Sequence, residues 1–344
     1  MDHVEIKDNV GHAAISCKSD PTEPQWTRES GFVMERISFH HNYIHDIATE
    51  GFYIGYNNYE NPGPAGHAHQ IHDLEVYDNI VDKTQWDGIQ VGCTTSNGKV
   101  YRNTVTNFGL QGNSNQDNGM IFGTGVIDME VYGNYIETGT SSSIGILYHG
   151  NGNLDLYNNV IINPGNRGIA LSVNSARSDV PSNPYLNVHH NTVVVLSNNI
   201  GINSFVPTLD TDGVTKKAHN NAVVYGNGQS CVSGFAGSDS TGNACNQGSV
   251  PASWKLNSDY IPASGSALAA AGVTGTGVTR DYNCQTRPSP PTIGAFEVNS
   301  TPTCLVNPVP TPTATPTPST SAASSSLSAI QLLLAMAAAL FVVT

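Results

Sequence analysis

One short motif recurs along the chain and limits its possible folds more than any other feature. Each copy has apolar residues at alternate positions before an Asn and two more after it. The copies are "HVEIKDNV" (3–10), "ISFHHNYI" (37–44), "LEVYDNIV" (74–81), "GKVYRNTV" (98–105), "MEVYGNYI" (129–136), "LDLYNNVI" (154–161), "LNVHHNTV" (186–193) and "KKAHNNAV" (216–223). Alternation predicts β-strands, and the recurrence predicts a repeat protein.

A second unit follows most copies of the first and begins with Gly. It reads "EGFYIG" (50–55), "DGIQVG" (87–92), "NGMIFG" (118–123), "IGILYH" (144–149), "RGIALS" (167–172) and "IGINSF" (200–205). Three short strands per coil predict an all-β, right-handed parallel β-helix solenoid, in which equivalent residues stack about 4.8 Å apart. We expect an Asn ladder formed by Asn9, Asn42, Asn79, Asn103, Asn134, Asn159, Asn191 and Asn221. A leucine-rich repeat would need a Leu-rich consensus and a tighter period.

With these columns, residues 1–235 resemble the right-handed parallel β-helix (pectate-lyase-like) superfamily. Its members include polysaccharide lyases, polygalacturonases, epimerases, tailspikes and adhesins, and none of their catalytic motifs matches here residue by residue. The stretch "RDYNCQTRPSPPTIGAFE" (280–297) is similar to the ending of uncharacterised β-helix surface proteins, with Cys284 where that pattern has Gly. We therefore expect residues 236–298 to form a C-terminal extension or cap.

The composition and the two ends of the chain indicate where the protein acts. The 344 residues carry a net charge of -13, so nucleic acid is not an expected partner. Residues 299–329 predict a disordered Pro/Thr/Ser stalk, and 330–344 an apolar tail typical of a GPI-anchor signal. A single tail anchor in the membrane is the alternative. Met1 falls inside the first coil, which favours a fragment without its signal peptide over an internal start.

Six cysteines fit an oxidising, extracellular compartment. We pair Cys231 with Cys245 and Cys284 with Cys304. Cys17 and Cys93 lie in coils that are not adjacent, so both are free or one has lost its partner with a missing N-terminus. Asn299 heads the one glycosylation sequon, which makes the protein a predicted glycoprotein.

The candidate site lies where the Gly-led strand begins. The position before the Gly is filled in successive coils by Glu50, Asp87, Asn118, Ile144, Arg167 and Ile200. The resemblance implies that the outer face of this strand forms a substrate groove. Glu50, Asp87 and Arg167 are the candidate catalytic residues. The candidate substrate-binding residues are Tyr53, Tyr56, Tyr59, Trp86 and Gln90, because aromatic faces suit sugar rings.

The acidic residues of this column also suggest a cation. Glu50 and Asp87 belong to adjacent coils, so their carboxylates should lie within about 5–7 Å and repel unless they share a proton or a cation. Asp117 and Asn118 add oxygens from the next coil, and an all-oxygen set suits Ca²⁺. Arg167, about 14 Å from Asp87, would meet a bound acidic sugar.

Simpler interpretations stand beside each of these. An acid before a turn Gly is common turn chemistry. His40, His189 and His219 share a column with Tyr77, Tyr101, Tyr132 and Tyr157, which predicts an outward stacking ladder more readily than a metal site. His67, His69 and His72 lack a third fixed ligand.

Two functional classes follow from the sequence. One is an extracellular lyase- or hydrolase-like protein acting on an acidic polysaccharide. The other is a non-catalytic cell-surface protein that binds glycans or mediates adhesion. In either case we expect a monomer whose partners are a glycan and, through its C-terminal anchor, a membrane.

Overall fold

The computed structural model describes residues 1–19, 32–56, 69–173, 183–196, 199–205 and 213–304. They belong to one compact unit, Met1–Pro310, while a second unit, Thr311–Thr344, lies wholly outside them. The predicted apolar tail and the stalk beyond residue 304 are therefore not described. Within the described ranges, none of the helices combines the length and apolar character that a membrane crossing requires.

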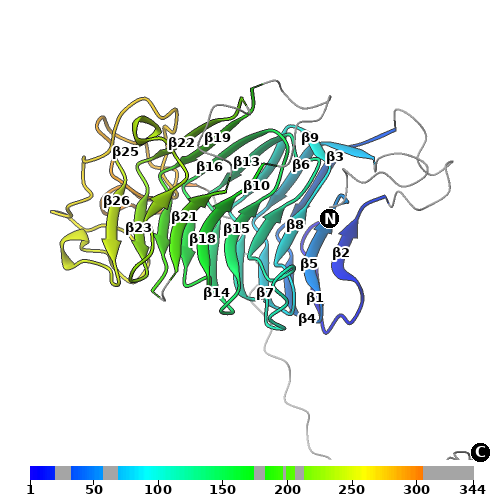
Figure 1. Ribbon diagram of the computed structural model, residues 1–344. Helices are drawn as coiled ribbons and strands as arrows, with labels where there is room; N and C mark the ends of the chain where they lie inside the picture. The colour runs from blue at the N-terminus through cyan, green and yellow to red at the C-terminus, as the bar shows by residue number, and fades with distance from the viewer. Residues whose placement is uncertain (20–31, 57–68, 174–182, 197–198, 206–212, 305–344) are drawn as a thin grey trace, which may run out of the picture. The chain divides into compact units, whose positions relative to one another are not determined.

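Three parallel sheets make up the described unit (Figure 1). Sheet A contains β3 (Val33–His40), β6 (Gln70–Tyr77), β10 (Gly98–Tyr101), β13 (Asp128–Tyr132), β16 (Asn153–Tyr157), β19 (Tyr185–His189), β22 (Thr215–His219) and β25 (Ser240–Thr241), with β9 (Thr94–Ser96) paired to β6. Sheet B contains β1 (Glu5–Lys7), β4 (Tyr43–Ile47), β7 (Ile80–Thr84), β11 (Thr104–Phe108), β14 (Tyr135–Gly139), β17 (Val160–Ile162), β20 (Thr192–Val194), β23 (Ala222–Tyr225) and β26 (Ala244–Gln247). Sheet C contains β2 (Ala13–Cys17), β5 (Glu50–Ile54), β8 (Ile89–Val91), β12 (Met120–Phe122), β15 (Ile144–Tyr148), β18 (Arg167–Leu171), β21 (Ile200–Ser204) and β24 (Val232–Ser233).

The chain visits the three sheets in a fixed order. It passes from sheet A to sheet B to sheet C and then begins again, as β6, β7 and β8 do. Each coil therefore adds one strand to every sheet, and the predicted parallel β-helix is confirmed. Inward side chains of all three sheets form one apolar core, which includes Phe52, Val76, Val105, Met120 and Tyr148. Two short 3₁₀ helices, η3 (Gly237–Asp239) and η4 (Ala252–Trp254), come late in the described chain.

The Asn ladder lies at the turn between sheets A and B. The Asn79 side-chain amide donates to Oδ1 of Asn103 at 2.9 Å, and the Asn79 backbone N–H donates to the same oxygen at 3.1 Å. The amide also donates to the carbonyl of Phe39 in the preceding coil at 3.0 Å. The pattern continues to Asn243, one coil beyond the predicted ladder. Each buried turn group thus finds a partner in a neighbouring coil.

Asn9 is not part of the ladder, and its predicted place there is wrong. Strand β1 pairs Glu5 with Tyr43, so Val4 occupies the ladder position beside Asn42. The Asn42 Oδ1 accepts the Val4 backbone N–H at 3.2 Å. Asn9 instead accepts a hydrogen bond from the Gly11 backbone and donates to the Ala13 carbonyl. Alternating apolar residues fit more than one register, and only a shared Asn distinguishes them.

The first Gly of each sheet C unit has no room for a side chain, because its backbone lies against core residues and against the next coil. A Cβ on Gly119 would lie 2.6 Å from Cγ2 of Ile136 in the core and 2.7 Å from the carbonyl oxygen of Gly145. Gly88 meets Val105 and Gly119 in the same way. Because Gly88 and Ile89 both face the core, the alternation breaks there, and the residue before the Gly faces outward.

The C-terminal part of the unit covers the outer face of sheet B. Val160, Ile162, Val194 and Val224 form a second apolar cluster with residues of the later chain, namely Trp254, Leu268, Ile293 and Phe296. The predicted disulfides Cys231–Cys245 and Cys284–Cys304 are both present. Cys17 and Cys93 take no part in either of these disulfides, and the Cys93 thiol donates to the Tyr56 carbonyl at 3.1 Å.

The "RP…IGAFE" stretch contains a buried ion pair between Arg287 and Glu297. The Arg287 guanidinium donates to Oε1 of Glu297 at 2.7 Å and to Oδ1 of Asn158 at 2.8 Å. Asn158 immediately precedes the ladder residue of its coil, so Arg287 joins the C-terminal segment to the solenoid. Removing one partner would leave a buried charge unpaired, which typically destabilises a protein by about 3–5 kcal/mol.

We predict that the ladder dominates the stability of the coils. Asn134→Ala removes the oxygen that accepts from the backbone N–H and the side-chain amide of Asn103. It also removes the amide that donates to the Val100 carbonyl. The substitution should therefore lower the free energy of unfolding by about 3 kcal/mol. Asn9→Ala is the matched control, because that side chain lies outside the ladder, and it should cost less than about 1 kcal/mol. Urea unfolding followed by circular dichroism measures both. Equal losses in the two variants would contradict this role of the ladder.

Candidate functional site

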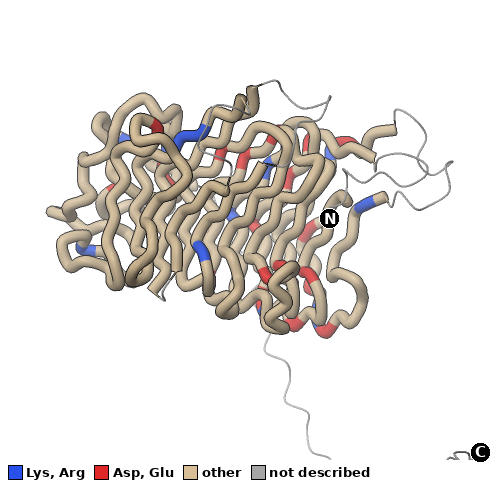
Figure 2. Tube along the Cα trace, viewed as in Figure 1, with Lys and Arg blue, Asp and Glu red and all other residues tan. Residues whose placement is uncertain are grey.

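The predicted column of residues that precede the Gly is present. It lies where the strands of sheet C begin. Gly51 N–H bonds to the Asp87 carbonyl and Gly88 N–H to the Asn118 carbonyl, which sets Glu50, Asp87 and Asn118 on successive coils. The register then continues through Ile144 and Arg167. Figure 2 shows acidic residues gathered along the coils nearest the N-terminus, where this column begins.

Three acidic side chains of this region are buried. Glu50 and Asp87 have no exposed surface, and Asp117 is 1% exposed. Asp87 Oδ1 accepts the Asn118 backbone N–H at 2.7 Å and its side-chain amide at 2.9 Å. Yet Oδ2 of Asp87, Oε2 of Glu50 and Oδ1 of Asp117 have no hydrogen-bond partner within the described part of the chain. Each acid therefore keeps one buried oxygen that water, a proton or a ligand could satisfy.

Burial changes how these acids titrate. Loss of water raises the pKa of Glu50 to about 7. It also raises the pKa of Asp87 to about 7, against the two Asn118 hydrogen bonds and with a smaller contribution from the charges of Glu50 and Asp117. Burial likewise raises the pKa of Asp117, although the Ser142 hydroxyl donates to it and opposes the shift. Near neutral pH the cluster is thus poised between proton donor and proton acceptor.

The loop between β11 and β12 contacts the acids and Trp86. Gln116 Nε2 lies 3.5 Å from Oε1 of Glu50. The Trp86 indole N–H donates to the side chain of Gln111, and the Gly109 N–H donates to the Trp86 carbonyl at 3.1 Å. A ligand that reaches the acids must therefore displace or replace contacts made by this loop.

The other predicted sugar contacts are only partly brought together. Tyr53 and Gln90 are paired in adjacent strands, and both are buried. Lys18, a residue that the repeat pattern did not single out, places its ammonium 4.1 Å from the ring centre of Tyr53 and 5.4 Å from that of Tyr56. Tyr59 lies outside the described residues. The cation over these rings occupies faces that a sugar would need.

Arg167 is apart from the acids. It lies in the same column, three coils beyond Asp87, as the register requires. Its guanidinium lies 4.6 Å from the ring centre of Phe205, and its Nε is buried and unpartnered among the described residues. Burial lowers the pKa of this guanidinium. Arg167 can therefore contact a distant unit of a long ligand but cannot neutralise Glu50 or Asp87.

The calcium set of Glu50, Asp87, Asp117 and Asn118 stays a prediction. Over the described ranges, no group of three His, Cys, Asp or Glu side chains is arranged to hold a metal ion. The Asn118 amide is already bonded to Asp87. The three unpartnered carboxylate oxygens are nevertheless the kind of ligand that Ca²⁺ takes. Asn299, the predicted glycosylation site, is exposed and donates to Ser264 Oγ at 2.9 Å.

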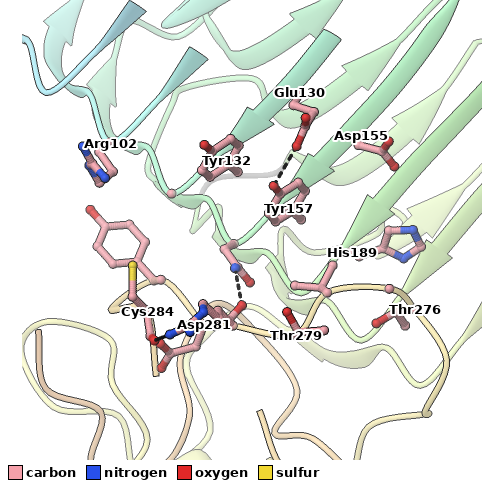
Figure 3. A pocket seen from close by; sticks show the side chains of 16 residues that line it. Arg102, Glu130, Tyr132, Asp155, Tyr157, His189, Thr276, Thr279, Asp281 and Cys284 are labelled. Atoms are coloured by element: carbon pink, nitrogen blue, oxygen red, sulfur yellow. Dashed lines mark hydrogen bonds between the residues drawn. The ribbon is translucent and has the colours of Figure 1, made fainter. Parts of the chain in front are cut away.

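Two further features lie on sheet A. Tyr77, Tyr101, Tyr132 and Tyr157 stack with ring centres 4.8–4.9 Å apart and within 2° of parallel, which confirms the predicted ladder. A later segment covers part of this ladder and forms the second wall of a cavity of 440 Å³ (Figure 3). The repeat pattern stops near residue 223, so the position of that segment could not be inferred from it.

Neither a protein-family model nor a curated protein matches this chain. The likeness to the pectate-lyase-like superfamily therefore rests on the columns and on the parallel sheets alone. Function has to be argued from the geometry of the sites.

We predict that protein stability falls as the pH rises through the site's titration range. Unfolded Glu50 and Asp87 titrate near their ordinary pKa values of 4.5 and 3.8, and the folded pair near 7. Between these limits the folded state binds more protons, so the free energy of unfolding decreases from about pH 4 to about pH 7. Glu50→Gln with Asp87→Asn should remove this loss and stabilise the protein at pH 8 by on the order of 3 kcal/mol.

The matched control is Glu35→Gln with Asp73→Asn, because these two carboxyls are exposed on sheet A. Urea unfolding at pH 5 and at pH 8 measures all three proteins. A wild-type protein that is more stable at pH 8, with no change in the Glu50 and Asp87 variant, would show that the acids are solvated.

Proposed function

We propose that this protein is an extracellular carbohydrate-active β-helix protein. It acts on, or binds, an acidic polysaccharide where the strands of sheet C begin. One observation carries the proposal. Glu50, Asp87 and Asp117 are buried together, and each has a carboxylate oxygen with no hydrogen-bond partner among the described residues. Such groups cost free energy unless a ligand, proton or cation completes them.

The chemistry that these acids support is proton transfer to and from a sugar. With pKa values near 7, one of Glu50 and Asp87 can hold a proton while the other is ionised. Adjacent coils lie about 4.8 Å apart, which is close to the separation of about 5–5.5 Å found between the carboxyl groups of retaining glycoside hydrolases. A lyase would use the ionised acid as the base instead. Asn118 holds Oδ1 of Asp87 and so orients its other oxygen.

Acidic sugars fit the column better than neutral ones through Arg167. Its partly buried guanidinium has an unpartnered Nε within the described chain and lies about 14 Å from Asp87 by strand spacing. A uronate several units along the chain could pair with it. Ca²⁺ is included in the proposal: the unpartnered carboxylate oxygens of Glu50, Asp87 and Asp117 would hold it, and its charge would offset theirs and attract an acidic sugar.

The non-catalytic alternative has an observation of its own. The loop that carries Gln111 and Gln116 contacts both Trp86 and Glu50. If that loop stays closed, the acids only accept hydrogen bonds from the turns, and glycans bind elsewhere on the surface. We also propose attachment to the cell surface through the C-terminal tail, supported by the two disulfides, which indicate an oxidising compartment.

The polysaccharide proposal predicts activity or calcium-linked binding that depends on Glu50 and Asp87. The protein is incubated with uronate and neutral polysaccharides, and unsaturated products and new reducing ends are measured. Glu50→Gln with Asp87→Asn should lower any activity at least about 100-fold, as expected when acid–base catalysis is lost. The Glu35→Gln, Asp73→Asn control should keep it.

Calorimetry with calcium distinguishes the remaining cases. Heat that appears with wild type and control but not with the Glu50 and Asp87 variant supports the cation site. If neither products nor calcium-dependent binding appear with any polysaccharide, the sheet C proposal fails.

The surface proposal predicts that residues 300–344 anchor a secreted reporter to a eukaryotic membrane. A phosphatidylinositol-specific phospholipase should release that reporter, because a GPI signal is replaced by a lipid. A reporter that stays on the membrane after treatment has a tail anchor, and one found in the medium without treatment has no anchor.

A further inference from the structure

The cavity on sheet A lies between two parts of the chain that are distant in sequence. One wall is the outer face of β13 and β16, with the phenol edges of Tyr132 and Tyr157 and the carboxylates of Glu130 and Asp155. The other wall is the segment 276–284, including Thr276 and Thr279 (Figure 3). The volume of 440 Å³ is within the usual range for ligand sites, about 300–1,000 Å³.

The strand wall offers hydrogen-bond acceptors with capacity to spare. Glu130 accepts the Tyr157 hydroxyl at 2.9 Å. Asp155 accepts the Tyr185 hydroxyl at 3.0 Å and the Asn187 amide at 2.8 Å. An ionised carboxylate has about four acceptor positions, so both can accept further hydroxyl groups.

His189 adds a polar group that the protein leaves unsatisfied. It lines the cavity, is 4% exposed, and its Nδ1 has no hydrogen-bond partner in the described chain. Burial lowers its pKa to about 4, so the ring is neutral at pH 7 and provides one donor and one acceptor. Tyr132 keeps its hydroxyl hydrogen, because burial raises its pKa to about 12.

Other ligand classes fit this lining poorly. An anion would need free basic groups, but Arg102 is held by both oxygens of Asp78, at 2.8 and 2.6 Å, and Arg280 donates to the Cys284 carbonyl at 2.8 Å. A flat aromatic ligand would need an open ring face, whereas Tyr101 and Tyr157 cover both faces of Tyr132, and Tyr132 covers one face of Tyr157. The polar groups of the lining that stay available are therefore hydroxyls, carboxylates and one neutral imidazole, beside apolar atoms of residues such as Val278.

We infer that this cavity is a second saccharide site, which binds an uncharged, hydroxyl-rich sugar through Glu130, Asp155, Tyr157 and His189. Carboxylates and phenols accept and donate to vicinal hydroxyl groups, and the same two carboxylates repel a uronate. The site therefore differs from the proposed sheet C site both in its position on the helix and in the charge of its ligand, and it does not depend on that proposal.

The test is titration of the full chain with cellotriose, tri-N-acetylchitotriose and trigalacturonate, followed by NMR of the imidazole signals and by calorimetry. At least one uncharged trisaccharide should bind below about 10 mM and shift the His189 signals, while trigalacturonate should leave them unchanged. Tyr157→Phe with Asp155→Asn should weaken binding about tenfold or more, since two polar contacts are lost.

Tyr77→Phe is the matched control, because Tyr77 belongs to the same stack but does not line the cavity. It should leave binding unchanged, as should Glu50→Gln with Asp87→Asn. Circular dichroism of each variant confirms that the β-helix is intact. Three results would each overturn the inference: no shift of the His189 signals with either uncharged sugar, an equal loss of binding in Tyr77→Phe, or a shift produced by trigalacturonate alone.

Discussion

Amide-to-amide hydrogen bonds between coils determine where every other side chain of this protein lies. From Asn79 onward, the side-chain oxygen of each ladder Asn accepts from two donors of the preceding coil, as Asn103 does from Asn79. Strand side chains alternate with a period of two, so a slip of one residue would turn the core outward. By fixing the register at one turn, the ladder places Gly88 against the core and Asp87 beside Glu50. The stacked tyrosines and the acid column are therefore consequences of the same bonds.

The same dependence explains which parts of the fold could be predicted from the sequence. Where a coil carries the ladder Asn, its neighbours in each column could be named correctly, as with Tyr101 and Tyr132. In the first coil Val4 replaces the Asn, and alternation alone led to the wrong residue, Asn9. Asn243 was missed for the opposite reason, because its coil has short strands and few apolar residues around the Asn. The disulfides could be predicted because their partners lie close in sequence.

The parts that could not be predicted are those that cross from one coil to another outside the repeat. Arg287 reaches Asn158 across 129 residues, and Gln116 reaches Glu50 across 66. Neither contact repeats, so no column in the sequence reveals it. These crossing segments decide the character of both candidate sites. The one that carries Gln116 approaches Glu50, and the one that includes Thr279 forms the second wall of the cavity beside Tyr157. The sequence could therefore indicate the acids of sheet C but not their surroundings.

The two faces show how surroundings give the same side chain different chemistry. Asp155 lies on an outward position of β16 and Asp87 lies just before β8, each one coil from another acid. Asp155 accepts from a hydroxyl and an amide and lines an open cavity, where it can accept further hydrogen bonds. Asp87 has one oxygen bonded by Asn118 and the other buried without a partner in the described chain, so burial raises its pKa to about 7. An acid of the first kind recognises hydroxyl groups, whereas one of the second kind exchanges protons or binds a cation. In the two proposals, recognition and proton chemistry belong to different sheets of the solenoid, and the same ladder holds the coils of both in register.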